Sequence, residues 1–453
     1  MRECASFLDD VSMQNSEGVC SGIKSKFPVT RTVADRVFAQ GGIRILKGGV
    51  PRTTRDESTG GKAIVCRRNN RSRMLLIFIL VFSPLTGGTQ VPGMDGKLRV
   101  VELEGTPYEM GKTHGATLKP EITELIRRWK ADLAKTYKTS AEEYIRKFLI
   151  HTDFRPAIEK WTPGLLDEVR GLADGAGVDF ETMYAFQLID ESWVMSDHLV
   201  FDKCTSINAG KRAGFPSFTS QTMDIPGFYH GFQTVLRIRD KSADLETLVF
   251  TIPGVVALNG LNSRSVGVCV NAVTQLASSP KGLPVAFVIR GILRQKTYED
   301  AVKFLQDIPP AAPQNYMIGG PLKAADFERS AGRMVSVLPF EGAEFVYHTN
   351  HPVINDDLNP DFLASLKKNG VSLETYRTFC PRFKFLAGAL TDNSTKIDLA
   401  ALKTIYANRA SGINNAGTYG CTIMVLGEKP ELHISPGRPD VEPFQILGFS
   451  TSR

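Results

Sequence analysis

The chain has 453 residues, and 54 Lys or Arg against 48 Asp or Glu give it a formal charge of +6. Residues 1–73 hold 14 basic and 7 acidic residues, which leaves 40 basic and 41 acidic residues in the other 380. A near-neutral body has no basic stripe to neutralise phosphates, so nucleic-acid binding is excluded as the default function. The hydrophobic content of 42% is typical of a globular protein with a large core.

The beginning of the chain reads as a leader. Residues 1–73 show no sustained helical or strand period and end in a basic run, and residues 74–82 are continuously apolar. A run of this length is shorter than the roughly 18 residues of a membrane span but fits the apolar part of a signal peptide. We predict a non-native or disordered leader over 1–73 and a signal peptide-like segment over 74–90. The mature protein is then secreted or periplasmic with no stable membrane span; a short buried strand is the alternative for the apolar run.

Residues 91–453 are expected to form one domain, and its first third is expected to be helical. From Glu121 to Lys138 the apolar residues recur with a helical period. Ser140 and Glu143 have the spacing of a capping box in front of another helix. The segment Leu165–Gly175 ends on a glycine, which is typical of a helix C-terminus.

The pattern changes at Cys204, where short β-branched and aromatic runs begin to alternate with turn residues. Helices are expected within this part over Leu283–Leu293 and Tyr298–Asp307. The expected strands are CTSINAG, FPSFTSQTMD, QTVLRIRD, ETLVFTI, SVGVCVNAV, EFVYHTN, TIMVLGE and ELHISPG. Helices interleaved with antiparallel strands predict a layered α+β sandwich.

The cysteines and histidines do not indicate a metal site. Four cysteines lie in the body, at wide spacing and without a C-x-x-C pair: Cys204, Cys269, Cys380 and Cys421. His348 and His351 do not share a face of a strand, so a structural hydrogen-bonding role is favoured over metal binding. The sequence implies no metal and no organic cofactor.

Cys204 is the candidate nucleophile, although a lone cysteine is more often a small buried hydrophobe. The papain-type signature that would supply a histidine base is absent. One solution needs no histidine: after cleavage of the bond before Cys204, the new α-amino group, with a pKa near 8, is the general base. A positioned Asn amide is able to stabilise the oxyanion.

An ordered set of short motifs resembles the acyl-coenzyme A:6-aminopenicillanic acid acyltransferase (isopenicillin N acyltransferase) family of N-terminal-nucleophile hydrolases. The set spans about residues 100–447, and its specificity lies in the order of its members. The motifs are Gly105–Gly115, Glu168–Gly175, Cys204-Thr-Ser206, Gln221-Thr-Met-Asp224, Asn315-Tyr-Met-Ile318, His348-Thr-Asn-His351 and Ser435-Pro-Gly437.

This resemblance implies a four-layer αββα N-terminal-nucleophile sandwich that cleaves itself before Cys204. Asp224 is then similar to the aspartate that orients the nucleophile, and Asn315 to the oxyanion-hole asparagine. A family arginine matches Arg377 or Arg382, of which we take Arg377 as the site residue. The sequence departs from the family at Lys203, where a glycine is frequent.

Other interpretations of these residues remain open at this stage. Asp224 precedes Ile-Pro-Gly and is also suited to accepting backbone hydrogen bonds in a turn. Asn315 is also compatible with a simple loop. Asn271 interrupts an apolar strand, which fits a second polar site residue and a strand-end hydrogen bond equally well.

The predicted function is that of a thiol-dependent amidohydrolase matured by autoproteolysis. It would act on a small N-acyl amide through a thioester, and its two cleavage fragments would stay associated. The alternatives are an acyltransferase that moves the acyl group to a specific amine, and a non-catalytic secreted binding protein.

Overall fold

The computed structural model describes residues 30–32, 98–195, 204–390 and 396–450. Most of the predicted leader and the whole signal peptide-like segment lie outside these residues. Thr30–Thr32 form a short strand, β1, which pairs in parallel with β11 (Met334–Leu338). The domain boundaries predicted from the sequence therefore remain predictions.

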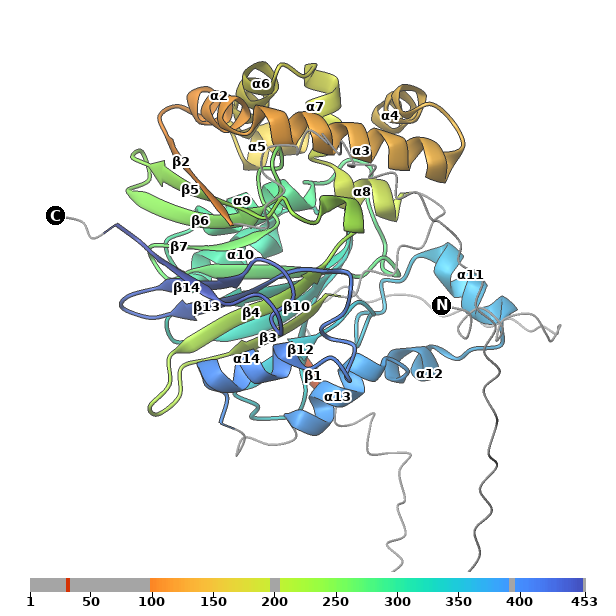
Figure 1. Cartoon of the computed structure of the whole chain (residues 1–453). Helices are drawn as coiled ribbons and strands as arrows, with labels where there is room; N and C mark the ends of the chain where they lie inside the picture. Colours follow the sequence, from red (N-terminus) through yellow and green to blue (C-terminus); the bar gives the residue numbers. More distant parts are fainter. Residues whose placement is uncertain (1–29, 33–97, 196–203, 391–395, 451–453) are drawn as a thin grey trace, which may run out of the picture. The chain divides into compact units, whose positions relative to one another are not determined.

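Two β-sheets form the centre of the protein (Figure 1). Within the described residues, the larger sheet has nine strands in the order β1-β11-β10-β9-β8-β7-β6-β5-β2. Its further strands are β2 (Arg99–Glu104), β5 (Thr234–Asp240), β6 (Leu245–Thr251), β7 (Asn259–Asn262), β8 (Gly267–Ala272), β9 (Gln314–Gly319) and β10 (Ala324–Arg329). Neighbours from β5 to β11 pair antiparallel, whereas β2 joins β5 in parallel.

The second sheet has six strands among the described residues, in the order β12-β3-β4-β13-β14-β15. The strands are β3 (Thr205–Ala209), β4 (Ser217–Asp224), β12 (Phe345–His348), β13 (Thr418–Leu426), β14 (Glu431–Ser435) and β15 (Gln445–Gly448). The two sheets stack face to face, because side chains of β3 and β4 donate hydrogen bonds to β8 and β10 of the larger sheet.

Helices cover the outer face of each sheet. Against the larger sheet lie α2 (Pro107–Thr117), α3 (Lys119–Tyr137), α4 (Ala141–Ile150), α5 (Arg155–Trp161), α6 (Leu165–Ala176), α7 (Phe180–Phe186), α8 (Ile189–Val194), α9 (Val285–Leu293) and α10 (Tyr298–Asp307). Against the smaller sheet lie α13 (Pro381–Ala389) and α14 (Leu399–Ala407), whereas α11 (Pro360–Lys368) and α12 (Leu373–Thr378) lie at one side of the sandwich. The four-layer α+β sandwich predicted from the sequence is confirmed (Figure 1).

The helical part follows the predicted pattern. In α3 the apolar stripe is buried, including Ile122, Leu125 and Trp129. The Ser140 side chain accepts from the Glu143 amide and caps α4, as the spacing predicted. The cap and the apolar stripe are local features of the sequence, and they set where α3 and α4 lie along the chain.

Two motifs of the resemblance form one packing unit. Helices α2 and α6 lie in backbone contact, because Gly111 of α2 and Gly171 of α6 have no side chain between them. A Cβ added at Gly111 would lie 1.8 Å from the Glu168 carbonyl oxygen, and one at Gly171 would lie 2.0 Å from the Tyr108 carbonyl oxygen. The glycines therefore set the distance between these helices.

Candidate active site

Cys204 immediately precedes β3 and is 7% exposed. Residues 196–203 lie outside the described part, so the Lys203–Cys204 bond is not described. The Cys204 thiol lies 3.9 Å from the Asp224 carbonyl oxygen, which its weak S–H donor faces. The antiparallel register of β3 and β4, with Thr205 opposite Thr222, places these two strand ends side by side.

Asp224 is the last residue of β4 and is 4% exposed. Its carboxylate accepts a hydrogen bond from the Asn415 side-chain amide, in the loop before β13. Asn415 is itself held, because its own side-chain oxygen accepts from the Gly417 amide at 2.8 Å. The sequence analysis did not identify Asn415, since only the pairing of β4 with β13 brings it to Asp224.

Of the two arginines considered for the site, Arg382 is the one that contacts Cys204. Its guanidinium donates to the Cys204 carbonyl oxygen and to Thr205 Oγ1 (2.9 Å). It also donates to Asn350 Oδ1 at 3.1 Å. Arg382 lies in the first turn of α13, and this helix packs on β12 beside β3.

Arg377, the arginine chosen from the sequence, has different described partners. Its guanidinium donates to the Asn355 carbonyl oxygen (2.7 Å) and to the Asp356 carboxylate (2.8 Å). These bonds fasten the loop after β12 rather than the end of β3. The two arginines are five residues apart and belong to different helices, a difference that the sequence pattern did not reveal.

Asn315 belongs to a buried polar layer between the two sheets. It lies on β9 directly opposite Asn271 on β8, and the Asn271 amide nitrogen donates to Asn315 Oδ1 at 3.0 Å. Asn271 Oδ1 in turn accepts from Ser206 Oγ (2.8 Å) and from Gln221 Nε2 (3.0 Å). Asn315 is thus connected through Asn271 to Ser206, two residues beyond Cys204. Both asparagines face the interior of the sandwich, so the simple-loop interpretation of Asn315 is wrong.

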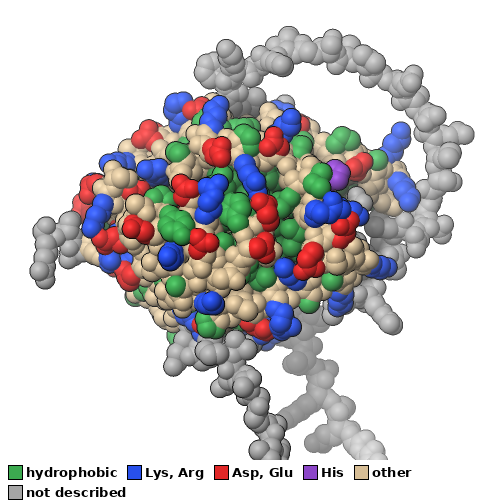
Figure 2. All heavy atoms as spheres, turned by 90° about the horizontal axis from the view of Figure 1, so that it is seen from above, with side chains coloured by type: hydrophobic (Ala, Val, Ile, Leu, Met, Phe, Trp, Pro, Cys, Tyr) green, Lys and Arg blue, Asp and Glu red, His purple; other side chains and the backbone are tan. Residues whose placement is uncertain are grey.

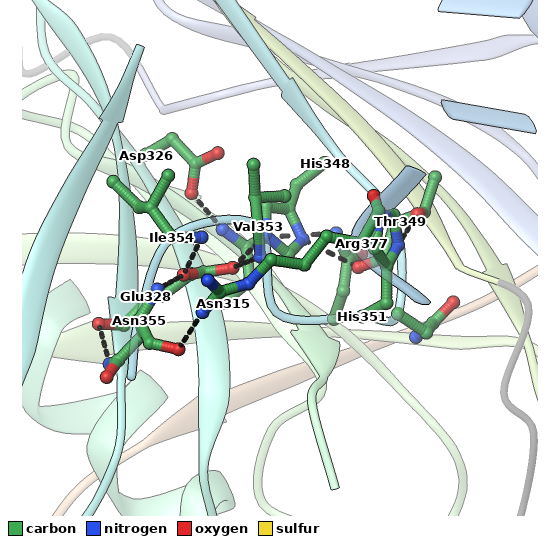
Figure 3. Close-up of polar contacts among 12 residues, drawn as sticks. Asn315, Asp326, Glu328, His348, Thr349, His351, Val353, Ile354, Asn355 and Arg377 are labelled. Atoms are coloured by element: carbon green, nitrogen blue, oxygen red, sulfur yellow. Dashed lines mark hydrogen bonds and ion pairs between the residues drawn. The ribbon is translucent and has the colours of Figure 1, made fainter. Parts of the chain in front are cut away.

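A buried ion pair lies at the other side of Asn315 (Figure 3). The His348 ring donates through Nε2 to the Glu328 carboxylate (3.0 Å) and through Nδ1 to the Thr349 carbonyl oxygen (2.6 Å). Neither acceptor carries a proton to give, so the ring is an imidazolium. Glu328 also accepts from the amides of Val353, Ile354 and Asn355.

The pKa values agree with this assignment. Burial acts to lower the pKa of His348, but the charges of Asp326 and Glu328 and the hydrogen bonds raise it to about 9. Burial acts to raise the pKa of Glu328, and the bond to His348 outweighs this and lowers it. Both groups are charged at neutral pH, and their hydrogen bonds to the backbone hold the turn after β12 in place.

His351 is neutral, and its pKa is lowered to about 3, chiefly by burial. Its ring donates to the Arg377 carbonyl oxygen at 3.0 Å and accepts from Thr349 Oγ1 at 2.9 Å (Figure 3). The structural role that the sequence favoured for His348 and His351 is confirmed. No group of three or more His, Cys, Asp or Glu suited to a metal ion occurs in the described part of the chain.

Three observations concern the surface and the helices of the described residues. Seen from the side of helices α2–α7, acidic and basic side chains are interspersed around apolar ones (Figure 2). Two clefts among the described residues have volumes of about 610 and 580 Å³, the first within this helical layer and the second between α2, β5 and α9. Cys204 lines neither of them. Within the described ranges, every helix is too short or too polar to cross a bilayer.

Comparison with known proteins identifies the group to which the chain is related. Residues 248–367 match the family model described as acyl-coenzyme A:6-aminopenicillanic acid acyl-transferase. The matched segment contains Asn271, Asn315 and the Glu328–His348 pair, and it excludes Cys204. Over these residues the chain is similar to this acyltransferase family. The resemblance inferred from the motifs is thereby confirmed.

Individual relatives agree in sequence at a low level. The 40 kDa form of acyl-coenzyme A:6-aminopenicillanic-acid-acyltransferase from Emericella nidulans is 26% identical over 281 residues, 57% of this chain and 72% of the relative. Protein dcd1A from Dictyostelium discoideum is 26% identical over 112 residues, 21% of this chain and 25% of that protein. A Caenorhabditis elegans N-acylethanolamine-hydrolyzing acid amidase ortholog aligns over 55% of this chain and 100% of its own, with 18% identity and a TM-score of 0.36.

Proposed function

We propose that this acyltransferase relative is a cysteine N-terminal-nucleophile amidohydrolase that cleaves small N-acyl amides. The observation that carries the proposal is the position of Cys204 at the start of β3, in contact with both Asp224 and Arg382. These three residues come from separate parts of the sequence, and the sheet register and α13 bring them to one point. The similarity to the Emericella nidulans acyltransferase, named for the transfer of an acyl group, supports this class of reaction.

Maturation would begin with attack of the Cys204 thiol on the carbonyl carbon of Lys203. The peptide bond shifts to a thioester, and water then cleaves it to give the Lys203 carboxylate and a free α-amino group on Cys204. In the proposed mechanism Arg382 holds the Cys204 carbonyl oxygen, which fixes the backbone of the nucleophile during both steps.

The catalytic cycle uses the new amino group as the base. It takes the thiol proton, and the sulfur attacks the substrate amide carbon to form a tetrahedral oxyanion. The protonated amine then gives its proton to the leaving nitrogen, so the amine product departs and a thioester remains. Water, activated by the same amino group, releases the carboxylic acid and restores the thiol.

The amides of Asn315 and Asn271 supply the polar side of this proposed site. Amide N–H groups directed at a developing oxyanion are worth roughly a hundredfold to a thousandfold in kcat. Asn315 is kept from the sequence analysis as the oxyanion donor, and Asn271, left open there, is its direct hydrogen-bonded neighbour. No metal or organic cofactor is needed for any of these steps.

The two cleavage fragments are proposed to remain one protein. Strand β2 precedes Cys204 and pairs with β5, which follows it, over six residue pairs from Arg99–Thr234 to Glu104–Arg239. Helix α8 also accepts at Asp190 Oδ1 from Gln314 of β9 at 2.9 Å. Separation of the fragments would break a sheet edge and uncover the larger sheet.

Acyl transfer to a specific amine is the second candidate, favoured by the relationship to an acyltransferase. Both candidates share the thioester and differ only in the acceptor. Secretion or periplasmic location is also proposed, because the basic run before residue 74 and the apolar residues 74–82 resemble a signal peptide. N-terminal sequencing of protein recovered from the medium tests it, and a mature chain that begins at Met1 contradicts it.

The decisive test of the proposed function compares two cysteine variants. Hydrolysis of N-acyl-7-amino-4-methylcoumarins should be lost in Cys204→Ala and kept in Cys421→Ala, whose buried thiol lies on β13. Addition of free amines to the wild type then distinguishes hydrolysis from transfer, because a transferase forms the new amide. Unchanged hydrolysis by Cys204→Ala would rule out the proposed nucleophile.

A further inference from the structure

Asp326 is a buried carboxyl group that the proposed mechanism does not use. It lies on β10, is 0% exposed, and accepts through Oδ1 a hydrogen bond from the Asn315 amide nitrogen (Figure 3). Its second oxygen, Oδ2, has no hydrogen-bond partner among the described residues. A buried polar atom without a hydrogen-bond partner lowers the stability of the fold. The presence of a carboxyl group at this position therefore needs an explanation.

The hydrogen bonds in the polar layer all run in one direction. Ser206 and Gln221 donate to Asn271, Asn271 donates to Asn315, and Asn315 donates to Asp326. In each asparagine the oxygen therefore faces the preceding residue of this series and the nitrogen faces the following one. The series ends at Asp326, whose Oδ1 acts only as an acceptor.

Hydrogen bonds decide which way an Asn amide points, because its two flipped orientations have almost the same shape. Without an acceptor at position 326, the Asn315 side chain loses the group that keeps its nitrogen on that side. A flip would bring its nitrogen toward the Asn271 nitrogen, so that Asn271 would have to flip as well. The bond to Asp326 uses one of the two hydrogens on the Asn315 nitrogen and leaves the other for a ligand.

The surroundings keep this acceptor in place. Glu328 lies two residues after Asp326 on the same face of β10. His348, on β12, faces the Glu328 carboxylate. Burial raises the pKa of Asp326 to about 8, with Glu328 adding to this effect and His348 and Asn315 opposing it. Asp326 Oδ1 accepts from Asn315 whether the carboxyl group is ionised or protonated.

We propose that Asp326 is a positioning residue that fixes the direction of the Asn315 amide and, through it, that of Asn271. The inference rests on the proposed function, because it assigns the two amides to the oxyanion. Asp326 itself is not expected to contact the substrate. Its contribution is to keep N–H groups, rather than carbonyl oxygens, available to the reacting carbonyl group.

Two variants of Asp326 separate an acceptor role from a merely structural one. Asp326→Leu keeps the approximate shape and removes the acceptor, and kcat should fall about tenfold to a hundredfold, somewhat less than on loss of a donor itself. KM should stay within about twofold, since ground-state binding does not use the oxyanion contacts. Asp326→Asn retains an oxygen that can accept from Asn315 and should keep kcat within about fivefold of wild type.

The measurements are kcat and KM on N-acyl-7-amino-4-methylcoumarins and the acylation rate with p-nitrophenyl butyrate. Asp357→Asn is the matched control, because Asp357 binds Ser330 and Gly332 outside the series and should leave both rates unchanged. Equal kcat values for wild type and Asp326→Leu overturn the proposal, and so does an equal loss in both Asp326 variants. Failure of the proposed function has a different signature, namely turnover that persists in Cys204→Ala.

Discussion

Replacement of Glu328 by glutamine tests whether the buried ion pair braces the loop that carries the His-Thr-Asn-His motif. Glutamine has nearly the same shape but carries no charge. Its single oxygen can replace only one of the two carboxylate oxygens, of which Oε1 accepts from Val353 and Oε2 accepts from Ile354 and Asn355. His348 would then lose its hydrogen-bonded counter-ion, and its pKa would fall. The substitution should therefore destabilise the protein while leaving the neighbouring packing in place.

The magnitude follows from the contacts. Removal of one partner of a buried ion pair costs about 3–5 kcal/mol. The increase in the pKa of His348 from 6.5 to about 9 corresponds to a similar figure, roughly 3 kcal/mol. For a folded body of roughly 350 residues, with an unfolding entropy of about 2 cal/mol/K per residue, the melting temperature should fall by about 4–7 °C.

Thermal unfolding of wild type and Glu328→Gln at several pH values provides the assay. A raised histidine pKa gives stability that is fully present below pH 6.5 and is lost as the pH rises through about 9. The difference between the two proteins should therefore be largest near pH 6 and should shrink toward pH 9. A difference below 1 °C at pH 6, or one that grows with pH, would refute the assignment of a charged pair.

Three further predictions follow from other parts of the fold. Arg382→Ala should lower kcat/KM by about a hundredfold, because the charged hydrogen bonds at Cys204 are lost. Arg377→Ala should instead lower the melting temperature and keep kcat within about threefold. Equal kinetic losses in the two variants would contradict the separation of their roles. Gly111→Ala should destabilise the α2–α6 contact by about 3 kcal/mol or more. Gly388→Ala is the control: no atom lies within 4 Å of its new Cβ, so it should stabilise α13 by up to about 1 kcal/mol. Thermal unfolding of both variants checks this, and the opposite order of stabilities would contradict the backbone contact between α2 and α6. Burial lowers the pKa of His114 to about 3, so stability should be lost as the pH falls from 6.5 toward 3, by up to about 1.4 kcal/mol per pH unit; an acid-melting slope that His114→Gln leaves unchanged would disprove this.

Helices α3, α4, α6, α9 and α10 and about half of the described strands were predictable because their signals are local. The stripe from Glu121 to Lys138, the cap at Ser140 and the runs that became β3–β6, β8 and β12–β14 all carry their own periodicity. Helices α2, α5, α7, α8 and α11–α14 were not individually predicted. Helix α2 carries a local signal that was missed, because Thr106 and Glu109 form a capping box in front of it. Helix α13 has no side-chain cap, and burial of Phe383 and Leu386 against the smaller sheet holds it in place.

The candidate site was predictable in its residue types but not in all its members. Cys204, Asp224 and Asn315 were proposed from motif order, and the structure places the first two in contact and connects Asn315 to β3 through Asn271. Arg382 rather than Arg377 reaches Cys204, because the start of α13 falls between them. Asn415 and Asp326 carry no sequence signal, since only strand pairing and register bring them to Asp224 and Asn315.

The most direct test of the central claim is the intact mass of the purified protein before and after brief exposure to p-nitrophenyl butyrate. Two fragments are expected, of which the second begins at Cys204 and gains one butyryl group on that residue. Cys204→Ala should remain one chain and gain no acyl group. An active protein that stays uncleaved, or an acyl group located on another residue of the second fragment, would contradict the claim that Cys204 is the N-terminal nucleophile.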